Sequence, residues 1–260
     1  MIGPTPLHDF FKRGEVARDV RLLAAQGVLA PRAGEQLAIL ALLVEDADAE
    51  IRRTAEQTLT LIPAAALKAF LRRPDVPIDL REFFGDRGIF PDEIPTIERA
   101  GDPDAPLVDT APLESTVSDD DSRKSIVQQI AEMSFTDRLK AAIKGSREMR
   151  AILIRDTNKM IAAAVLSSPR LTDAEVGSFA RMTTVSEEVL RVIGNNRGWM
   201  KRYAIAVGLT RNPKTPLAMS LDLMSRLNER DLAKLSVDRN VPDPLRVAAR
   251  KKVVASTSRK

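Results

Sequence analysis

Apolar side chains recur at every third or fourth position through most of this chain, which is the spacing of amphipathic helices rather than of strands. A clear example lies before Pro63, where one apolar stripe consists of Ile51, Ala55, Leu59 and Ile62. The charged and polar residues between these positions fall on the opposite side of the helix. Asp48 precedes the stripe and is expected to cap the helix, and Pro63 is expected to end it.

The neighbouring segments follow related patterns. Residues 37–44 are apolar on every side, so a helix here has to be covered by more than one neighbour. After Pro63 two further apolar helices are expected, separated by a Pro-Asp-Val-Pro break. The sequence GDRG at Gly85–Gly88 reads as the stop of the second one.

The second half of the chain repeats one device, a short polar or proline-containing turn in front of a new apolar helix. New helices are expected at four such turns, which contain Thr172, Ser186, Thr215 and Pro242. Thr172 and Glu175 match a capping box. Thr215 is expected to cap a helix that begins at Pro216 and buries Leu221. Because helices this short cannot bury an apolar stripe alone, successive helices are expected to stack into a shared core, as in solenoids.

The helical pattern breaks between residues 89 and 121. This stretch holds five prolines and ten acidic residues, with Arg99 as its only base, and shows no sustained period. Such a composition is typical of a disordered linker. We therefore expect an N-terminal helical block over residues 1–88, an acidic linker over 89–121 and a basic C-terminal helical block over 122–260.

Several stretches resemble known helical repeats. EDADAEIRRTAEQTL resembles the second helix of a HEAT-type repeat, in which an Asp before the helix and an Arg within it commonly bond along the stack, and Asp48 and Arg52 occupy those two positions. NPKTP at Asn212–Pro216 is similar to turns of leucine-rich repeat variants. The C-terminal block, with LIRDTNKM at Leu153–Met160, is also similar to a group of uncharacterised bacterial proteins, which implies no function. These resemblances imply an all-α, armadillo-type fold of two α-solenoid blocks of HEAT-like repeats joined by the acidic Pro-rich linker.

The composition agrees with a helical chain and narrows the compartment. Aromatic residues make up only 4% of the chain, and Ala, Leu, Arg and Glu, which favour helices, are abundant. There is no cysteine, which excludes disulfides and cysteine-based metal sites. The first residues lack the features of a signal peptide, and no apolar run approaches the roughly 20 residues needed to cross a membrane. We therefore expect a cytoplasmic protein that does not act at a membrane.

The net charge of +4 is distributed unevenly. Residues 1–120 carry 13 Lys and Arg against 22 Asp and Glu, whereas residues 121–260 carry 27 against 14. The two halves therefore have opposite net charges, −9 and +13. One hypothesis is that the acidic linker lies on the basic block and competes with an acidic partner. The alternative is that the acidic residues only keep a spacer soluble and extended.

The residues that carry most enzyme chemistry are scarce. His8 is the only histidine, so triads and metal cages that depend on histidine are excluded. No glycine-rich phosphate-binding loop is present, because GDRG lacks the Lys-Ser/Thr that such a loop requires. Asp119–Asp121 lack the Gly and Glu of a calcium loop and read as a solvated acidic run. We expect no enzyme activity, no cofactor and no small-molecule substrate.

Basic residues gather in two stretches of the C-terminal half, the second of which also holds the only Trp and the only Tyr. The candidate partner-binding residues are Lys144, Arg147, Arg150, Arg155, Lys159, Arg197, Trp199, Lys201, Arg202, Arg211 and Lys214. Cations interleaved with aromatic side chains can bind an acidic peptide or a nucleic acid. Alternatively, they are only the solvated side of a helix whose buried stripe contains Met200, Tyr203, Ala204, Val207 and Gly208.

The pattern as a whole indicates a non-catalytic scaffold or adaptor. Its partner is expected to be another protein, bound through the basic face of the C-terminal solenoid. The alternative is a nucleic-acid-binding protein, because HEAT-like solenoids include DNA-glycosylase-type proteins that hold duplex DNA in a basic groove. Against that alternative, the basic excess is spread over 140 residues (121–260) rather than concentrated in one run.

Overall fold

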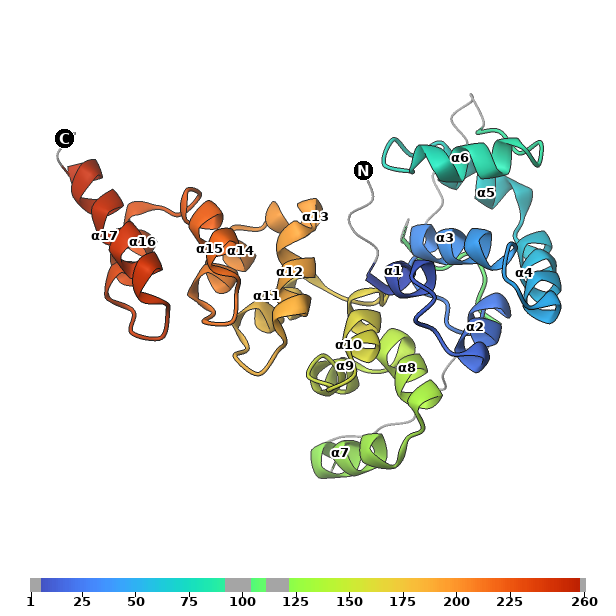
Figure 1. Cartoon of the computed structure of the whole chain (residues 1–260), viewed down its shortest axis with the longest axis horizontal. Coiled ribbons are helices and arrows are strands. Elements are labelled where there is room, and N and C mark those ends of the chain that lie inside the picture. Colours follow the sequence, from blue (N-terminus) through green and yellow to red (C-terminus); the bar gives the residue numbers. More distant parts are fainter. Residues whose placement is uncertain (1–5, 92–103, 111–121, 258–260) are drawn as a thin grey trace. The chain divides into compact units, whose positions relative to one another are not determined.

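The computed structural model describes residues 6–91, 104–110 and 122–257, and within these ranges every regular element is a helix (Figure 1). This confirms the predicted all-α class. The chain divides into two compact units, unit 1 (residues 1–171) and unit 2 (residues 172–260). This boundary differs from the predicted one, because the helices of residues 122–171 belong to the same unit as those of the first block. Residues 92–103 and 111–121 of the predicted linker lie outside the described residues.

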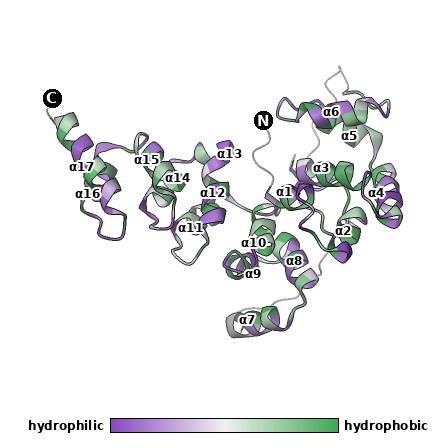
Figure 2. Ribbon diagram, in the orientation of Figure 1, coloured by the Kyte–Doolittle hydropathy of each residue, from purple (hydrophilic) through white to green (hydrophobic). Residues whose placement is uncertain are grey.

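Unit 1 contains ten of the helices. They are α1 (Pro6–Lys12), α2 (Arg18–Ala25), α3 (Ala33–Leu43), α4 (Ala49–Leu61), α5 (Ala64–Leu71), α6 (Ile78–Gly85), α7 (Ser122–Glu132), α8 (Phe135–Lys144), α9 (Arg147–Leu153) and α10 (Lys159–Leu166). Helix α10 is hydrophobic over nearly all of its length (Figure 2) and is buried from Met160 to Leu166. The predicted stop after α6 is present, and Gly88 adopts the left-handed φ of +73° that favours glycine.

The same three-helix motif occurs twice in unit 1, once as α2–α3–α4 and once as α8–α9–α10. In each copy the first helix packs against the third. A connection of five residues joins the second helix to the third, VEDAD at residues 44–48 and IRDTN at residues 154–158. The chain therefore contains an internal structural repeat that crosses the predicted linker.

A buried aspartate organises each of these connections. Asp46 accepts a hydrogen bond from Arg21 at 2.5 Å, and Asp156 accepts one from Arg138 at 2.8 Å. Each arginine is the fourth residue of the first helix in its motif. Each aspartate also accepts the backbone N–H of the residue two positions later. One carboxylate thus fixes the turn and ties it to the first helix.

The predicted cap of α4 is confirmed, and the same aspartate forms an ion pair with α2. The Asp48 side chain accepts the backbone N–H of Glu50, as an N-cap does. Its ionic partner is Arg18, at 2.7 Å. The Arg52 guanidinium donates to the backbone carbonyls of residues 46 and 47. The stripe Ile51, Ala55, Leu59 and Ile62 is buried as predicted.

Helix α1 connects the two motifs, since it packs against α3 of the first and α10 of the second. Its first turn is anchored by the buried carboxylate of Glu35, which accepts the backbone N–H groups of Leu7 at 2.8 Å and His8 at 3.1 Å. Burial raises the pKa of Glu35 above its ordinary value of 4.5, although these hydrogen bonds and the nearby Arg32 oppose the shift.

Residues 104–110 belong to the predicted linker but are packed against unit 1. The carbonyl of Asp104 accepts the backbone N–H of Ala33 at 3.1 Å. The side chain of Gln36 bonds to the backbone of Leu107 and Val108. For these seven residues the prediction of disorder is wrong, because polar groups on α3 bind their backbone.

Unit 2 contains the remaining helices. They are α11 (Asp173–Arg181), α12 (Glu187–Asn195), α13 (Arg197–Met200), α14 (Tyr203–Arg211), α15 (Leu217–Met224), α16 (Glu229–Val237) and α17 (Asp243–Thr257). Apart from the single turn of α13, they form three consecutive pairs, α11–α12, α14–α15 and α16–α17. A connection of five residues joins the helices of each pair: residues 182–186, 212–216 and 238–242.

The three connections also begin with the same backbone geometry. Met182, Asn212 and Asp238 end their helices with φ between −82° and −72° and ψ between 113° and 122°. Each donates its backbone N–H to the carbonyl three residues earlier. In each case the fourth residue of the connection is buried: Val185, Thr215 and Val241. Unit 2 is therefore built from one repeated helix–turn–helix unit.

The predicted buried stripe around Tyr203 is wrong. The helix is interrupted at Lys201 and Arg202, so α13 and α14 do not share one stripe. The core positions of α14 are Ile205, Ala206, Gly208 and Leu209. Tyr203 is 42% exposed, and its hydroxyl donates to Asp231 at 2.6 Å.

Helices begin directly after Thr172, Ser186 and Pro242, which lie in three of the four predicted turns. The capping box of Thr172 and Glu175 is present with both of its hydrogen bonds. The start at Thr215 is wrong by one position, since α15 begins at Leu217 with Pro216 as its N-cap. The Thr215 hydroxyl does not cap this helix but donates to the carbonyl of Leu209 at 2.7 Å.

Among the helices of the described ranges, none is both long enough and apolar enough to cross a membrane.

The burial pattern of α15 corrects the expectation that Leu221 is a core residue and leads to a stability prediction. Leu223 is 4% exposed, whereas Leu221 is 36% exposed. We expect Leu223→Ala to lower the free energy of unfolding by about 2–5 kcal/mol and Leu221→Ala to change it by only about 0.5 kcal/mol. Thr172→Ala, which removes the capping box, should cost about 1 kcal/mol. Urea unfolding followed by circular dichroism measures all three, and equal losses for the two leucines would contradict the described packing of α15.

The buried carboxyl of Glu35 leads to a pH-dependent prediction. Because its pKa is higher in the folded than in the unfolded chain, its contribution to stability is complete below pH 4.5 and is lost as the pH rises through the folded pKa. Glu35→Gln keeps a carbonyl acceptor for Leu7 and His8 but does not titrate. We therefore expect the variant to gain stability relative to the wild type as the pH rises above 4.5. Urea unfolding of both proteins between pH 4 and 8 tests this, and a difference independent of pH would contradict it.

Candidate functional site

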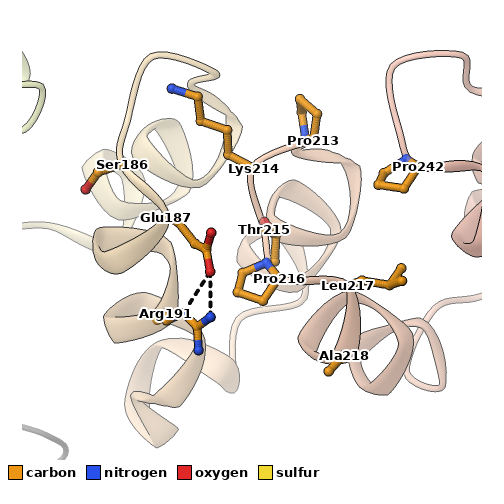
Figure 3. Close-up of a pocket in the computed structure, with 10 residues that line it drawn as sticks. All are labelled: Ser186, Glu187, Arg191, Pro213, Lys214, Thr215, Pro216, Leu217, Ala218 and Pro242. Atoms are coloured by element: carbon orange, nitrogen blue, oxygen red, sulfur yellow. Dashed lines mark hydrogen bonds and ion pairs between the residues drawn. The ribbon is translucent and has the colours of Figure 1, made fainter.

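The repeated connections of unit 2 border an open groove of about 680 Å³. Ser186, Pro216 and Pro242 are its equivalent members, because each directly precedes the second helix of a pair. The complete lining consists of Ser186, Glu187, Arg191, Pro213, Lys214, Thr215, Pro216, Leu217, Ala218 and Pro242. In Figure 3 the turn of residues 213–218 lies in the middle, with Glu187 and Arg191 on one side and Pro242 on the other.

The central turn is held rigidly by Asn212. This buried side chain donates to the carbonyl of Ala180 at 2.9 Å and of Met182 at 3.0 Å, which ties the turn to the preceding helix pair. Its carbonyl oxygen accepts the backbone N–H of Lys214 at 3.0 Å. The hydroxyl of Thr215 is used by the bond to Leu209. The polar groups inside the turn are thus satisfied internally, and Pro213 and the Lys214 side chain are exposed.

Lys214 supplies the groove's available positive charge. Arg191 is engaged by Glu187 one helical turn earlier, at 2.5 Å. Lys214 is exposed, and among the described residues no carboxylate lies within ion-pair distance of its ammonium group. The groove thus combines apolar proline, leucine and alanine surface with one cation that can pair with a ligand.

The candidate cations of the first basic stretch lie in unit 1 and differ in accessibility. Lys144 is only 6% exposed and pairs with Asp109. Arg150 is buried, and its guanidinium donates to the carbonyl of Gly145 at 2.9 Å. These two side chains are therefore not on the surface, contrary to the prediction. The exposed members of this group are Arg147, Arg155 and Lys159.

The candidates of the second stretch lie in unit 2 and are partly engaged. Trp199 is buried, so it packs in the protein rather than offering a surface for stacking. Arg202 is exposed but pairs with Asp173 at 2.6 Å, and Arg211 lies 3.8 Å from Asp238. Arg197, the first residue of α13, and Lys201, which directly follows this helix, are both exposed. The two stretches of candidate residues belong to different units of the chain.

Sequence reasoning included Lys214 but missed the apolar lining of the groove. Pro216 and Pro242 were recognised only as helix starts, and Pro213 and Leu217 were not considered as binding residues. The available signal was the recurrence of these starts, because equivalent positions of stacked helix pairs line up along one edge. No spacing in the sequence shows that this edge is hollow.

The described residues were also compared with the requirements of a metal site. Among them no group of three or more His, Asp or Glu side chains is placed to hold a metal ion. The groove of unit 2 contains one carboxylate, Glu187, which already pairs with Arg191. The arrangement is suited to binding through apolar contact and charge.

Comparison with known proteins gives no information about this groove. The chain matched no protein-family model, no curated protein and no solved structure. The resemblance to HEAT-type and leucine-rich-variant repeats therefore stays a prediction that rests on the quoted stretches of sequence.

Proposed function

We propose that unit 2 is a protein-binding module whose groove receives an extended, acidic segment of a partner protein. In this proposal the helix pairs are solenoid repeats, and the row formed by Ser186, Pro216 and Pro242 is the docking edge. The chain then acts as a non-catalytic scaffold or adaptor. The observation that carries the proposal is that three equivalent connections border one open groove, which has both apolar and charged lining residues.

The shape of the groove favours a polypeptide over a small molecule. Small-molecule sites are usually enclosed and contain several convergent polar groups that fix the ligand. This groove is open, and the polar groups of its central turn are used internally. Proline rings offer apolar surface without a backbone donor, so a segment lying across Pro213, Pro216 and Pro242 would be held by contact area.

The charge of unit 2 favours an acidic partner. Residues 172–260 carry 17 Lys and Arg against 9 Asp and Glu, a net charge of +8. Within the groove, Lys214 is the cation that can meet a carboxylate. Because this contact is exposed, it contributes little by itself, and the affinity should fall as the ionic strength rises.

Nucleic acid is the alternative ligand, and the pairing of cations weakens it. Phosphate binding depends on many unneutralised Lys and Arg side chains along one surface. In unit 2, Arg191, Arg202 and Arg211 each have a carboxylate partner. Of the two aromatic rings in this basic stretch, that of Trp199 is buried, and that of Tyr203 is exposed with its hydroxyl bonded to Asp231.

The proposal is tested by selecting peptides from a random displayed library against the full chain and measuring their affinities by fluorescence anisotropy. We expect the selected peptides to combine acidic with apolar residues. Leu217→Asp should weaken binding at least tenfold, because it places a charge on the apolar lining. Lys214→Glu, which reverses one exposed charge, should weaken it severalfold, and more at low than at high salt. Lys234→Glu, at an exposed position of α16 outside the lining, is the matched control and should bind as the wild type does.

Two results would contradict this function. One is a set of selected peptides that bind Lys214→Glu and Leu217→Asp as tightly as the wild type. The other is the absence of selected peptides together with retention of mixed-sequence duplex DNA at low salt, lost in a Lys201→Glu, Arg202→Glu variant. That second pattern would favour the nucleic-acid alternative.

A further inference from the structure

We propose that unit 1 contains a second, separate peptide-binding site, which its own residues 104–110 fill as an intramolecular ligand. The ligand class is a short segment with one carboxylate on each side of four apolar residues, as in DAPLVDT. A partner protein that carries such a segment would replace residues 104–110. This inference does not depend on the function proposed for unit 2.

The main chain of the segment is bound by a built polar group. Gln36 is only 3% exposed. Its side-chain carbonyl accepts the backbone N–H groups of Leu107 at 2.7 Å and Val108 at 3.2 Å, and its amide donates to the carbonyl of Val108 at 2.5 Å. Because these bonds involve the backbone of Leu107 and Val108, they do not depend on one particular side chain.

The backbone of the segment makes further close contacts with α2 and α3. The carbonyl of Asp104 accepts the N–H of Ala33, directly at the start of α3. Gly27, with φ +72°, leaves room for Val108, since a Cβ added to Gly27 would lie 3.0 Å from a methyl group of Val108. Thr110 donates its hydroxyl to the carbonyl of Gln26 at 2.8 Å. Unit 1 thus contacts the segment near both of its ends, at Asp104 and at Thr110.

The two carboxylates of the segment are recognised by cations from different parts of unit 1. Asp104 pairs with Arg73, beyond the end of α5, at 2.9 Å. Asp109 pairs with Lys144, the last residue of α8. The segment therefore reaches from the connection after α5 to the end of α8, and its two carboxylates lie against these two cations.

The segment differs from a structural element of the core because it buries no side chain completely. Each of residues 104–110 is partly or largely exposed, whereas Gln36 and Lys144 beneath it are buried. The core of unit 1 consists of side chains from its helices. Removal of the segment would thus expose polar groups that water can solvate, without taking a residue out of the hydrophobic core.

Covalent attachment explains how a segment with low intrinsic affinity can fill the site. A tethered ligand has a local concentration in the millimolar range, so residues 104–110 hold the site unless a partner of higher affinity competes. The site would then respond to partners that offer the same carboxylate spacing with a stronger apolar contact.

The test uses a fluorescein-labelled peptide of residues 102–112 and the full chain in which residues 104–110 are replaced by Gly and Ser. We expect this vacated chain to bind the peptide at least tenfold more tightly than the wild type, where the intramolecular segment competes. A peptide with Asp104→Asn and Asp109→Asn should bind the vacated chain at least tenfold more weakly. Fluorescence anisotropy measures each affinity.

A charge exchange provides the control for specificity. In the vacated chain, Lys144→Glu should reject the natural peptide and accept a peptide with Asp109→Lys. Lys140→Glu, on the same helix but with its ammonium near Asp137, should leave binding of the natural peptide unchanged.

Three results would overturn the inference. The vacated chain could keep its helical circular dichroism and cooperative unfolding yet fail to bind the peptide. It could instead lose its helical structure, which would make residues 104–110 an integral part of the fold. Finally, sedimentation could reveal wild-type dimers that the vacated chain does not form, which would identify the occupant as the segment of a second copy.

Discussion

The structure depends on satisfying the backbone polar groups at the ends of many short helices. Each helix leaves its first N–H and last C=O groups without partners inside the helix, and a buried group without a partner costs about 1–3 kcal/mol. Side chains in the connections meet this demand. Asp46 and Asp156 serve it in the two motifs of unit 1, and Asn212 serves it in unit 2. The same side chains also bond to a neighbouring helix, so each of them stabilises both a turn and the packing of two helices.

The two candidate binding surfaces follow from these connections. Near the start of α3 in unit 1, Gln36 binds the backbone of Leu107 and Val108. In unit 2, three connections of equal length bring Ser186, Pro216 and Pro242 to equivalent positions, and their prolines present apolar surface. The first surface is occupied by residues 104–110, and the second is open to solvent.

Charge restricts what each surface can bind. Counts of Lys and Arg alone overstate the positive charge that is available for binding. Many basic side chains already serve the fold: Lys144 pairs with Asp109, Arg202 with Asp173 and Arg138 with Asp156. Such pairs neutralise the cation and fix its position. The basic balance of the C-terminal half therefore does not describe one continuous cationic face, and this favours a short acidic segment over a long polyanion.

The sequence by itself determined the helical class, the capping box at Thr172 and the buried stripe that begins at Ile51, because these depend on spacing within one helix. Only the tertiary structure decided which side of a short helix is buried. Tyr203 and Leu221 fit a helical period but lie at the surface, since the break after α13 and the neighbours of α15 set the orientation. Tertiary structure also placed the unit boundary at residue 171 and docked residues 104–110. Their composition disfavours independent folding, but it carries no information about a complementary surface such as Gln36 and Lys144, which the fold assembles from helices distant in sequence.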